Sequence, residues 1–120
     1  GAFAKHLQML ERLHVPAIEV RYPQDLDSCI GLIIPGGEST AMNSQLEEND
    51  LLVALNSFAI RAPIFGTGAG MILMAQQGWI DISIERNAYG RQIDSFACQI
   101  QFQAKDFHAI FIRAPRITEI

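Results

Sequence analysis

Residues 29–40 read CIGLIIPGGEST, and residues 63–71 read PIFGTGAGM. Each stretch begins with a short apolar run, passes through a glycine-rich turn and continues into a segment that suits a helix. A nearly continuous apolar run is typical of a parallel strand covered on both faces. Strand, turn and helix in repeated order predict a mostly parallel α/β sheet. We therefore expect the strands Ile30–Ile34 and Pro63–Phe65 to be adjacent and parallel.

The flanking sequence extends this pattern and then changes it. In the first half, apolar periodicity predicts helices at Ala2–Leu13 and Leu51–Ala59, with a short strand at Ala17–Arg21 and a polar connection at Pro23–Ser28. In the second half, apolar and polar residues alternate over Ile80–Glu85 and Phe96–Phe102, and a further apolar strand is expected at Phe107–Ile112. Period-two alternation indicates strands with one wetter face, which are usually antiparallel. The expected fold is therefore a three-layer α/β domain, flavodoxin-like, with a mostly parallel sheet and antiparallel strands in the second half.

Composition limits the function classes. The chain has 120 residues, which suggests a single domain over residues 1–120, and 49% hydrophobic with 18% charged residues is a globular composition. The net charge is −4 and no basic block occurs, so a nucleic-acid partner is not expected. No apolar run approaches the roughly 20 residues of a membrane span. The two cysteines, Cys29 and Cys98, lack metal-ligand spacing and are expected in the core, so we predict no metal, no cofactor and a reducing cytoplasm.

The two glycine-rich turns are the candidate site, because ligands of open α/β sheets bind at the carboxyl ends of the strands. In the first turn, Pro35–Ser39, glycine lets the backbone approach a ligand, and Glu38 can accept a hydrogen bond from a ligand ammonium. The second turn, Gly66–Gly70, has the pattern of a nucleophile elbow, in which the central residue lies exposed at a helix N-terminus. That central residue is Gly68, which offers no nucleophile. The three histidines, His6, His14 and His108, are expected away from the elbow, in surface or packing roles.

Other interpretations of the turns remain. Each turn taken singly is as compatible with a plain tight connection as with a site. The spacing of Gly66, Gly68 and Gly70 does not match the dinucleotide fingerprint GxGxxG, and no Gly-Lys-Ser/Thr follows, which excludes a Walker loop.

Five segments together resemble one family. They are GAF at 1–3 with His6, GLIIPGGEST at 31–40, GTxAG at 66–70, IxIERNxYGRQ at 82–92 with SF at 95–96, and FIRAP at 111–115. In order and wording they resemble the glutaminase subunit of pyridoxal 5'-phosphate synthase, a class I glutamine amidotransferase. The PGGEST segment is shared with other amidotransferases, whereas the ERN–GRQ and FIRAP segments select this family.

The resemblance implies hydrolysis of L-glutamine to glutamate and ammonia, with ammonia passing to a barrel-fold synthase subunit for vitamin B6 biosynthesis. The family uses a Cys-His-Glu triad whose cysteine occupies the elbow and forms a thioester. By position, the resemblance implies an oxyanion hole made by the Gly37 and Ala69 amides. It also implies a glutamine pocket formed by Gly37, Glu38, Ser39, Arg86, Ile112 and Arg113.

The chain departs from the family pattern at Gly68, which stands at the position of the nucleophilic cysteine. The family's opening strand is expected before Gly1, its triad His and Glu beyond Ile120, and the stretch between Ala75 and Ile80 is shorter than usual. The glycine at position 68 predicts a form without glutaminase activity, whereas the other departures suggest an incomplete chain. The alternatives are a non-catalytic amidotransferase-like docking module and, less closely matched, a flavodoxin-like ligand-binding domain.

Overall fold

The structure is a computed structural model of the 120-residue chain, and it describes residues 3–37, 39–85, 88, 96–111 and 116–120. The chain divides into two compact units, Gly1–Ile80 and Asp81–Ile120. Within the described residues, no helix has the length and apolar character needed to cross a membrane.

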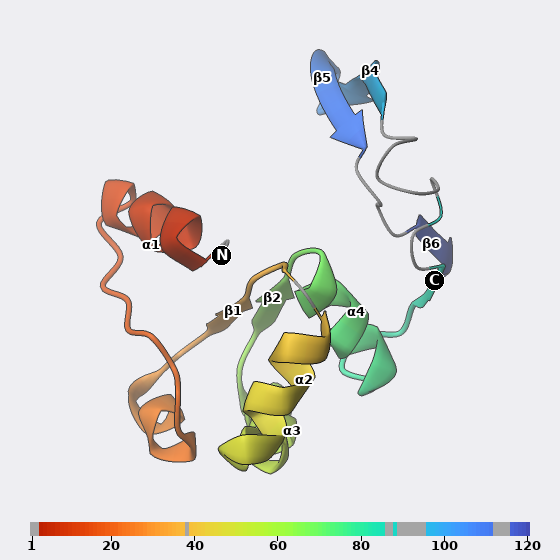
Figure 1. Ribbon diagram of the computed structural model, residues 1–120. Coiled ribbons are helices and arrows are strands. Elements are labelled where there is room, and N and C mark those ends of the chain that lie inside the picture. The colour runs from red at the N-terminus through yellow and green to blue at the C-terminus, as the bar shows by residue number, and fades with distance from the viewer. Residues whose placement is uncertain (1–2, 38, 86–87, 89–95, 112–115) are drawn as a thin grey trace. The chain divides into compact units, whose positions relative to one another are not determined.

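The first unit alternates helix and strand (Figure 1). Its elements are α1 (Phe3–Arg12), the 3-10 helix η1 (Pro23–Ser28), β1 (Leu32–Ile34), α2 (Ser39–Glu48), α3 (Leu51–Arg61), β2 (Ile64–Gly66) and α4 (Ala69–Gln76). Strands β1 and β2 pair in parallel, with Leu32 opposite Ile64 and Ile34 opposite Gly66. The predicted parallel pair is thereby confirmed, although β1 is shorter than the predicted Ile30–Ile34 and β2 begins one residue after the predicted Pro63.

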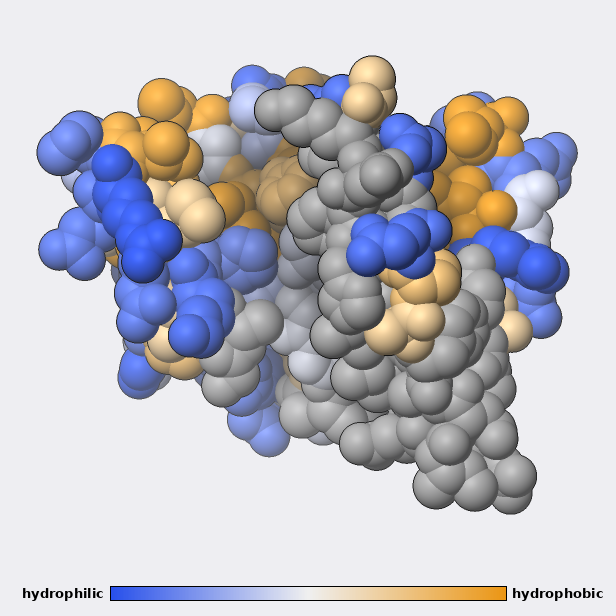
Figure 2. Space-filling view, turned by 90° about the horizontal axis from the view of Figure 1, so that it is seen from above, coloured by the Kyte–Doolittle hydropathy of each residue, from blue (hydrophilic) through white to orange (hydrophobic). Residues whose placement is uncertain are grey.

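The core of this unit gathers around α3. Its residues Leu51, Leu55 and Phe58 pack with Leu26 of η1, and Phe58 is only 1% exposed. These three residues recur at helical spacing, so one stripe of the helix is apolar and turns inward. Helix α4 is buried over most of its length, including Ile72, Leu73 and Met74. On the one face of the molecule that Figure 2 shows, hydrophobic and hydrophilic residues lie side by side.

The predicted strand at Ala17–Arg21 is wrong. Residues 15–21 belong to no strand, and Ile18 is 56% exposed. A strand forms only where a neighbouring strand takes up its amides and carbonyls, and none of the described residues pairs with this segment.

The connection after it, Pro23–Ser28, is a 3-10 helix whose start is fixed by Asp25. The Asp25 carboxylate accepts hydrogen bonds from the Arg21 and Tyr22 amides, both at 3.0 Å. These two hydrogen bonds hold the pKa of Asp25 below its ordinary value, because they favour the charged carboxylate.

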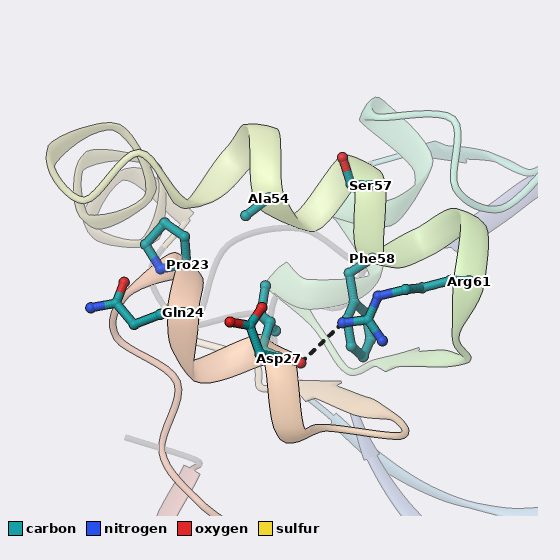
Figure 3. A pocket seen from close by; sticks show the side chains of 8 residues that line it. Pro23, Gln24, Asp27, Ala54, Ser57, Phe58 and Arg61 are labelled. Atoms are coloured by element: carbon teal, nitrogen blue, oxygen red, sulfur yellow. Dashed lines mark hydrogen bonds between the residues drawn. The ribbon is translucent and has the colours of Figure 1, made fainter.

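The side chain of Arg61 ties the end of α3 to η1 (Figure 3). Its guanidinium donates to the Leu26 carbonyl at 3.0 Å, the bond drawn in Figure 3. It also donates to the Cys29 carbonyl at 3.5 Å. It also lies 4.5 Å from the centre of the Phe58 ring. The Leu26 carbonyl also accepts from the Cys29 amide at 3.1 Å, so Arg61 adds a second donor there and a donor to the Cys29 carbonyl just after η1.

We expect Arg61→Ala to lower the free energy of unfolding by about 1–2 kcal/mol, because it removes two hydrogen bonds and a cation–π contact. Arg61→Lys should lower the free energy of unfolding by a smaller amount than Arg61→Ala, since an ammonium cannot bind both carbonyls as the planar guanidinium does. Urea denaturation measures the change. Arg12→Ala, at the exposed end of α1, is the matched control and should cost less than about 0.5 kcal/mol. An equal loss in both variants would contradict the assignment.

The second unit contains antiparallel pairs, as its alternating sequence predicts. Strands β4 (Phe96–Phe102) and β5 (Lys105–Phe111) form a hairpin, with Phe96 opposite Phe111. Its turn residues Gln103 and Ala104 both have positive φ, 51° and 61°, as a type I′ turn requires. Strands β3 (Ser83–Glu85) and β6 (Arg116–Glu119) also pair antiparallel, with an ion pair of 2.6 Å between Glu85 and Arg116. The predicted runs Ile80–Glu85 and Phe107–Ile112 are thus strands only in part, and Ile112 lies outside the described residues.

Candidate functional site

The two glycine-rich turns lie side by side in the first unit. Because β1 and β2 are parallel and in register, both turns leave the sheet at the same edge. The Thr67 amide donates to the Ile34 carbonyl at 3.0 Å, and the Gly36 amide donates to Thr67 Oγ1 at 3.1 Å. The turn after β1 is therefore held directly against the turn after β2.

Gly68 occupies the apex of a sharp strand-to-helix turn. Its backbone has φ 52° and ψ −118°, and α4 begins at the next residue, Ala69. The Gly70 amide donates to the Thr67 carbonyl at 2.8 Å, and the Ile72 amide donates to the Gly68 carbonyl at 3.2 Å. This is the positive-φ backbone of an elbow, which glycine adopts freely and L side chains only with strain, and which functional sites often contain.

The glycines on either side of Gly68 are required by packing. A Cβ at Gly66 would lie 2.6 Å from Met74 Sδ and 2.7 Å from the Gly70 carbonyl carbon, and one at Gly70 would lie 2.2 Å from the Ile34 oxygen. At Gly68 the nearest atom to a Cβ is Gly36 Cα, at 3.3 Å. Position 68 is therefore the one position of these three where a side chain fits after a small adjustment.

The position also favours negative charge. The first amides of a helix have no carbonyl partners within it, and the aligned peptide dipoles place partial positive charge at its N-terminus. Gly68 is exposed and directly precedes α4, so a group attached there would lie at that end of the helix. A thiolate or an oxyanion at this point would be stabilised electrostatically.

The structure brings together some of the predicted site residues. Gly37 has φ 142° and open space where a Cβ would be. It follows Gly36, whose Cα is the atom nearest to a Cβ at Gly68. Ala69 is the first residue of α4. Ser39 begins α2. Glu38, Arg86, Ile112 and Arg113 lie outside the described residues, so their roles stay predictions. Among the residues that the structure describes, no three His, Cys, Asp or Glu side chains come together as metal ligands.

The expectation that the histidines lie away from the elbow is wrong for His6. Its Nε2 lies 3.3 Å from Thr67 Oγ1, in a half-buried contact between α1 and the residue that precedes Gly68. The two residues are 61 positions apart. No local pattern in the sequence pairs them, so only the folded chain reveals the contact.

Comparison with a solved structure identifies the class of fold. The chain superposes over its whole length on 70% of a protein described as a glutamine amidotransferase, with a TM-score of 0.84 and 33% sequence identity. The fold is therefore that of a glutamine amidotransferase, α/β with a parallel sheet and an antiparallel pair.

Sequence comparison identifies the family. The model of the SNO glutamine amidotransferase family matches residues 1–120, and the chain belongs to that family. Similar relatives are each named pyridoxal 5'-phosphate synthase subunit PdxT. The protein from Francisella philomiragia is 42% identical, with all of this chain and 69% of the relative aligned. That from Moorella thermoacetica is 42% identical over all of this chain and 71% of the relative. That from Thermosipho africanus is 46% identical over 99% of this chain and 70% of the relative.

Proposed function

We propose that this chain is the glutaminase-type domain of a pyridoxal 5'-phosphate synthase and binds L-glutamine at the edge where β1 and β2 end. The observation that carries the proposal is the elbow at Gly68, which is packed against the Gly36–Gly37 turn and opens α4. The names of the relatives support the assignment to this synthase.

In the reaction that membership of the family implies, a cysteine thiolate at the elbow attacks the glutamine amide carbon, and the C–N bond breaks as the nitrogen takes up a proton and leaves as ammonia. Water then hydrolyses the thioester to glutamate and the free thiol. The amides of Gly37 and Ala69 would stabilise the oxyanion that forms during each step. Removal of one such donor costs about 3–4 kcal/mol in transition-state stabilisation. The ammonia would pass to the barrel-fold synthase subunit. Because Gly68 has no nucleophile, we propose that the present chain binds glutamine without hydrolysing it.

Glutamine binding by the Gly68 protein is the direct test. Binding needs the turn amides, Glu38, Arg86 and Arg113, and none of these depends on a thiol. We expect calorimetry on the full-length protein to detect binding of L-glutamine. Glu38→Gln should weaken binding by about tenfold or more, since a hydrogen bond to a charged group contributes about 1.5–3 kcal/mol.

Glu48→Gln is the matched control, because it makes the same change at the end of α2, away from the glycine turns. It should leave the dissociation constant unchanged, and D-glutamine should not bind. No heat with L-glutamine from a folded protein would refute the pocket.

A second function, a non-catalytic docking module, is favoured by the absence of a side chain at Gly68. Such a module would bind the synthase subunit without needing glutamine. Sedimentation of the mixed subunits would reveal a complex, and a complex that forms without any glutamine binding in calorimetry would favour this second function over the first.

A further inference from the structure

Thr67 is the centre of the hydrogen bonds that join the two glycine turns. Its amide donates to Ile34 at 3.0 Å, its carbonyl accepts from Gly70 at 2.8 Å, and its hydroxyl accepts from the Gly36 amide at 3.1 Å. The bonds with Ile34 and Gly36 join Thr67 to β1 and to the turn that follows it. The bond with Gly70 shapes the elbow. The rotamer of Thr67 therefore determines whether the Gly36 amide keeps its partner.

His6 is the residue that contacts this hydroxyl from outside the sheet. A hydroxyl has one proton and two acceptor sites, so Oγ1 can accept from Gly36 while it shares a second hydrogen bond with His6 Nε2. Helix α1 has no buried residue, so apolar packing alone holds it weakly. His6 is half-buried, and the hydrogen bond links the helix to the base of the elbow.

We propose that His6 is a positioning residue, which acts through the Thr67 hydroxyl to hold the Pro35–Gly37 turn against the elbow at Gly68. A fixed Thr67 rotamer keeps the Gly36 amide engaged. The next amide, that of Gly37, is then held at the edge where the proposed function places the developing negative charge. The effect on glutamine binding rests on the proposed function, whereas the effect on the turn itself does not.

The first experiment measures solvent exchange of the Gly36 amide by NMR in the Gly68 protein. His6→Ala should raise the exchange rate about three- to tenfold, the effect of losing one neutral hydrogen bond. Thr67→Val, which keeps the shape and removes the hydroxyl, should raise it at least as much. Because His6 acts through that hydroxyl, the double variant should exchange no faster than Thr67→Val alone.

Two further variants separate positioning from a general structural role. His6→Gln, whose amide can also donate or accept at this distance, should restore slow exchange at Gly36. Gln8→Ala, an exposed change on the same helix, should have no effect. Unchanged Gly36 exchange in His6→Ala would overturn the proposal. An equal rise at every amide of the unit, or additive effects in the double variant, would do the same.

The second experiment measures glutamine affinity in the same variants. His6→Ala should weaken binding about three- to tenfold, in line with the exchange effect, and His6→Gln should restore it. If the parent protein binds no glutamine, the proposed function fails and the exchange data alone decide the role of His6. Unchanged glutamine affinity in His6→Ala, with a parent that does bind, would overturn the positioning role.

Discussion

Gly68→Cys is expected to create a reactive thiol at the elbow and to start ammonia release from glutamine in the full-length protein. The backbone of position 68 already has the elbow conformation, and a Cβ there meets a single close atom, Gly36 Cα at 3.3 Å. The new thiol would lie at the N-terminus of α4, where the helix dipole lowers the pKa of a cysteine.

Reactivity is measured first, because it needs no other catalytic group. We expect iodoacetamide to alkylate position 68 at least about tenfold faster than Cys29 or Cys98, since a lower pKa and free access both raise the rate at neutral pH. Cys29 and Cys98 are internal controls: neither is fully exposed, and the Cys29 thiol donates to the Asp25 carbonyl at 3.4 Å. Added L-glutamine should protect position 68 alone.

Turnover is measured next. Loss of the nucleophile in a triad hydrolase costs about 10⁶ in kcat, so Gly68→Cys should raise ammonia release by at least about 10³-fold over the silent Gly68 protein. Gly68→Ala is the matched control, because it adds the same Cβ without a nucleophile and should stay silent. Both variants should lose about 1–3 kcal/mol of stability to backbone strain. Robust turnover by the Gly68 protein would overturn the mechanism, and silence from a folded cysteine variant would favour the docking module.

Gly70→Ala is expected to prevent folding of the first unit or to destabilise it severely. The added Cβ would lie 2.2 Å from the Ile34 oxygen and 2.8 Å from the Ile34 carbonyl carbon. Both atoms are backbone of β1, so relief requires separating α4 from the paired strands. Alanine would gain about 1 kcal/mol in helix propensity, which is too little to offset the clash. We expect a net loss above about 4 kcal/mol, a large part of the 5–15 kcal/mol of a typical domain.

Gly78→Ala is the control for Gly70→Ala. Gly78 has φ 72°, and a Cβ there would meet nothing within 4 Å. Gly78→Ala should therefore lose stability only through backbone strain, about 1–2 kcal/mol. Urea unfolding of both variants, followed by circular dichroism, tests the comparison. A Gly70→Ala protein as stable as Gly78→Ala would show that the strand and α4 are not packed so closely.

Local sequence determined the strand pairing in both halves of this protein and its family. The apolar runs before Pro35 and Gly66 predicted a parallel pair, and β1 and β2 form that pair. The expected cover on both faces is incomplete, because Phe65 of β2 is 60% exposed. Alternation in the second half predicted antiparallel strands, and the hairpin from Phe96 to Phe111 has that arrangement. The family, too, was recognisable from short segments in a fixed order, and the match over residues 1–120 confirms it.

Other features were decided only by tertiary structure. The apolar residues of Ala17–Arg21 form no strand, because strand formation depends on a pairing partner that the segment itself does not specify. The requirement for glycine at Gly70 arises from the Ile34 carbonyl, which lies on a different element. The contact between His6 and Thr67 joins residues 61 positions apart. Periodicity and turn composition describe neighbours along the chain, whereas these contacts exist only after α1, β1 and α4 have come together in space.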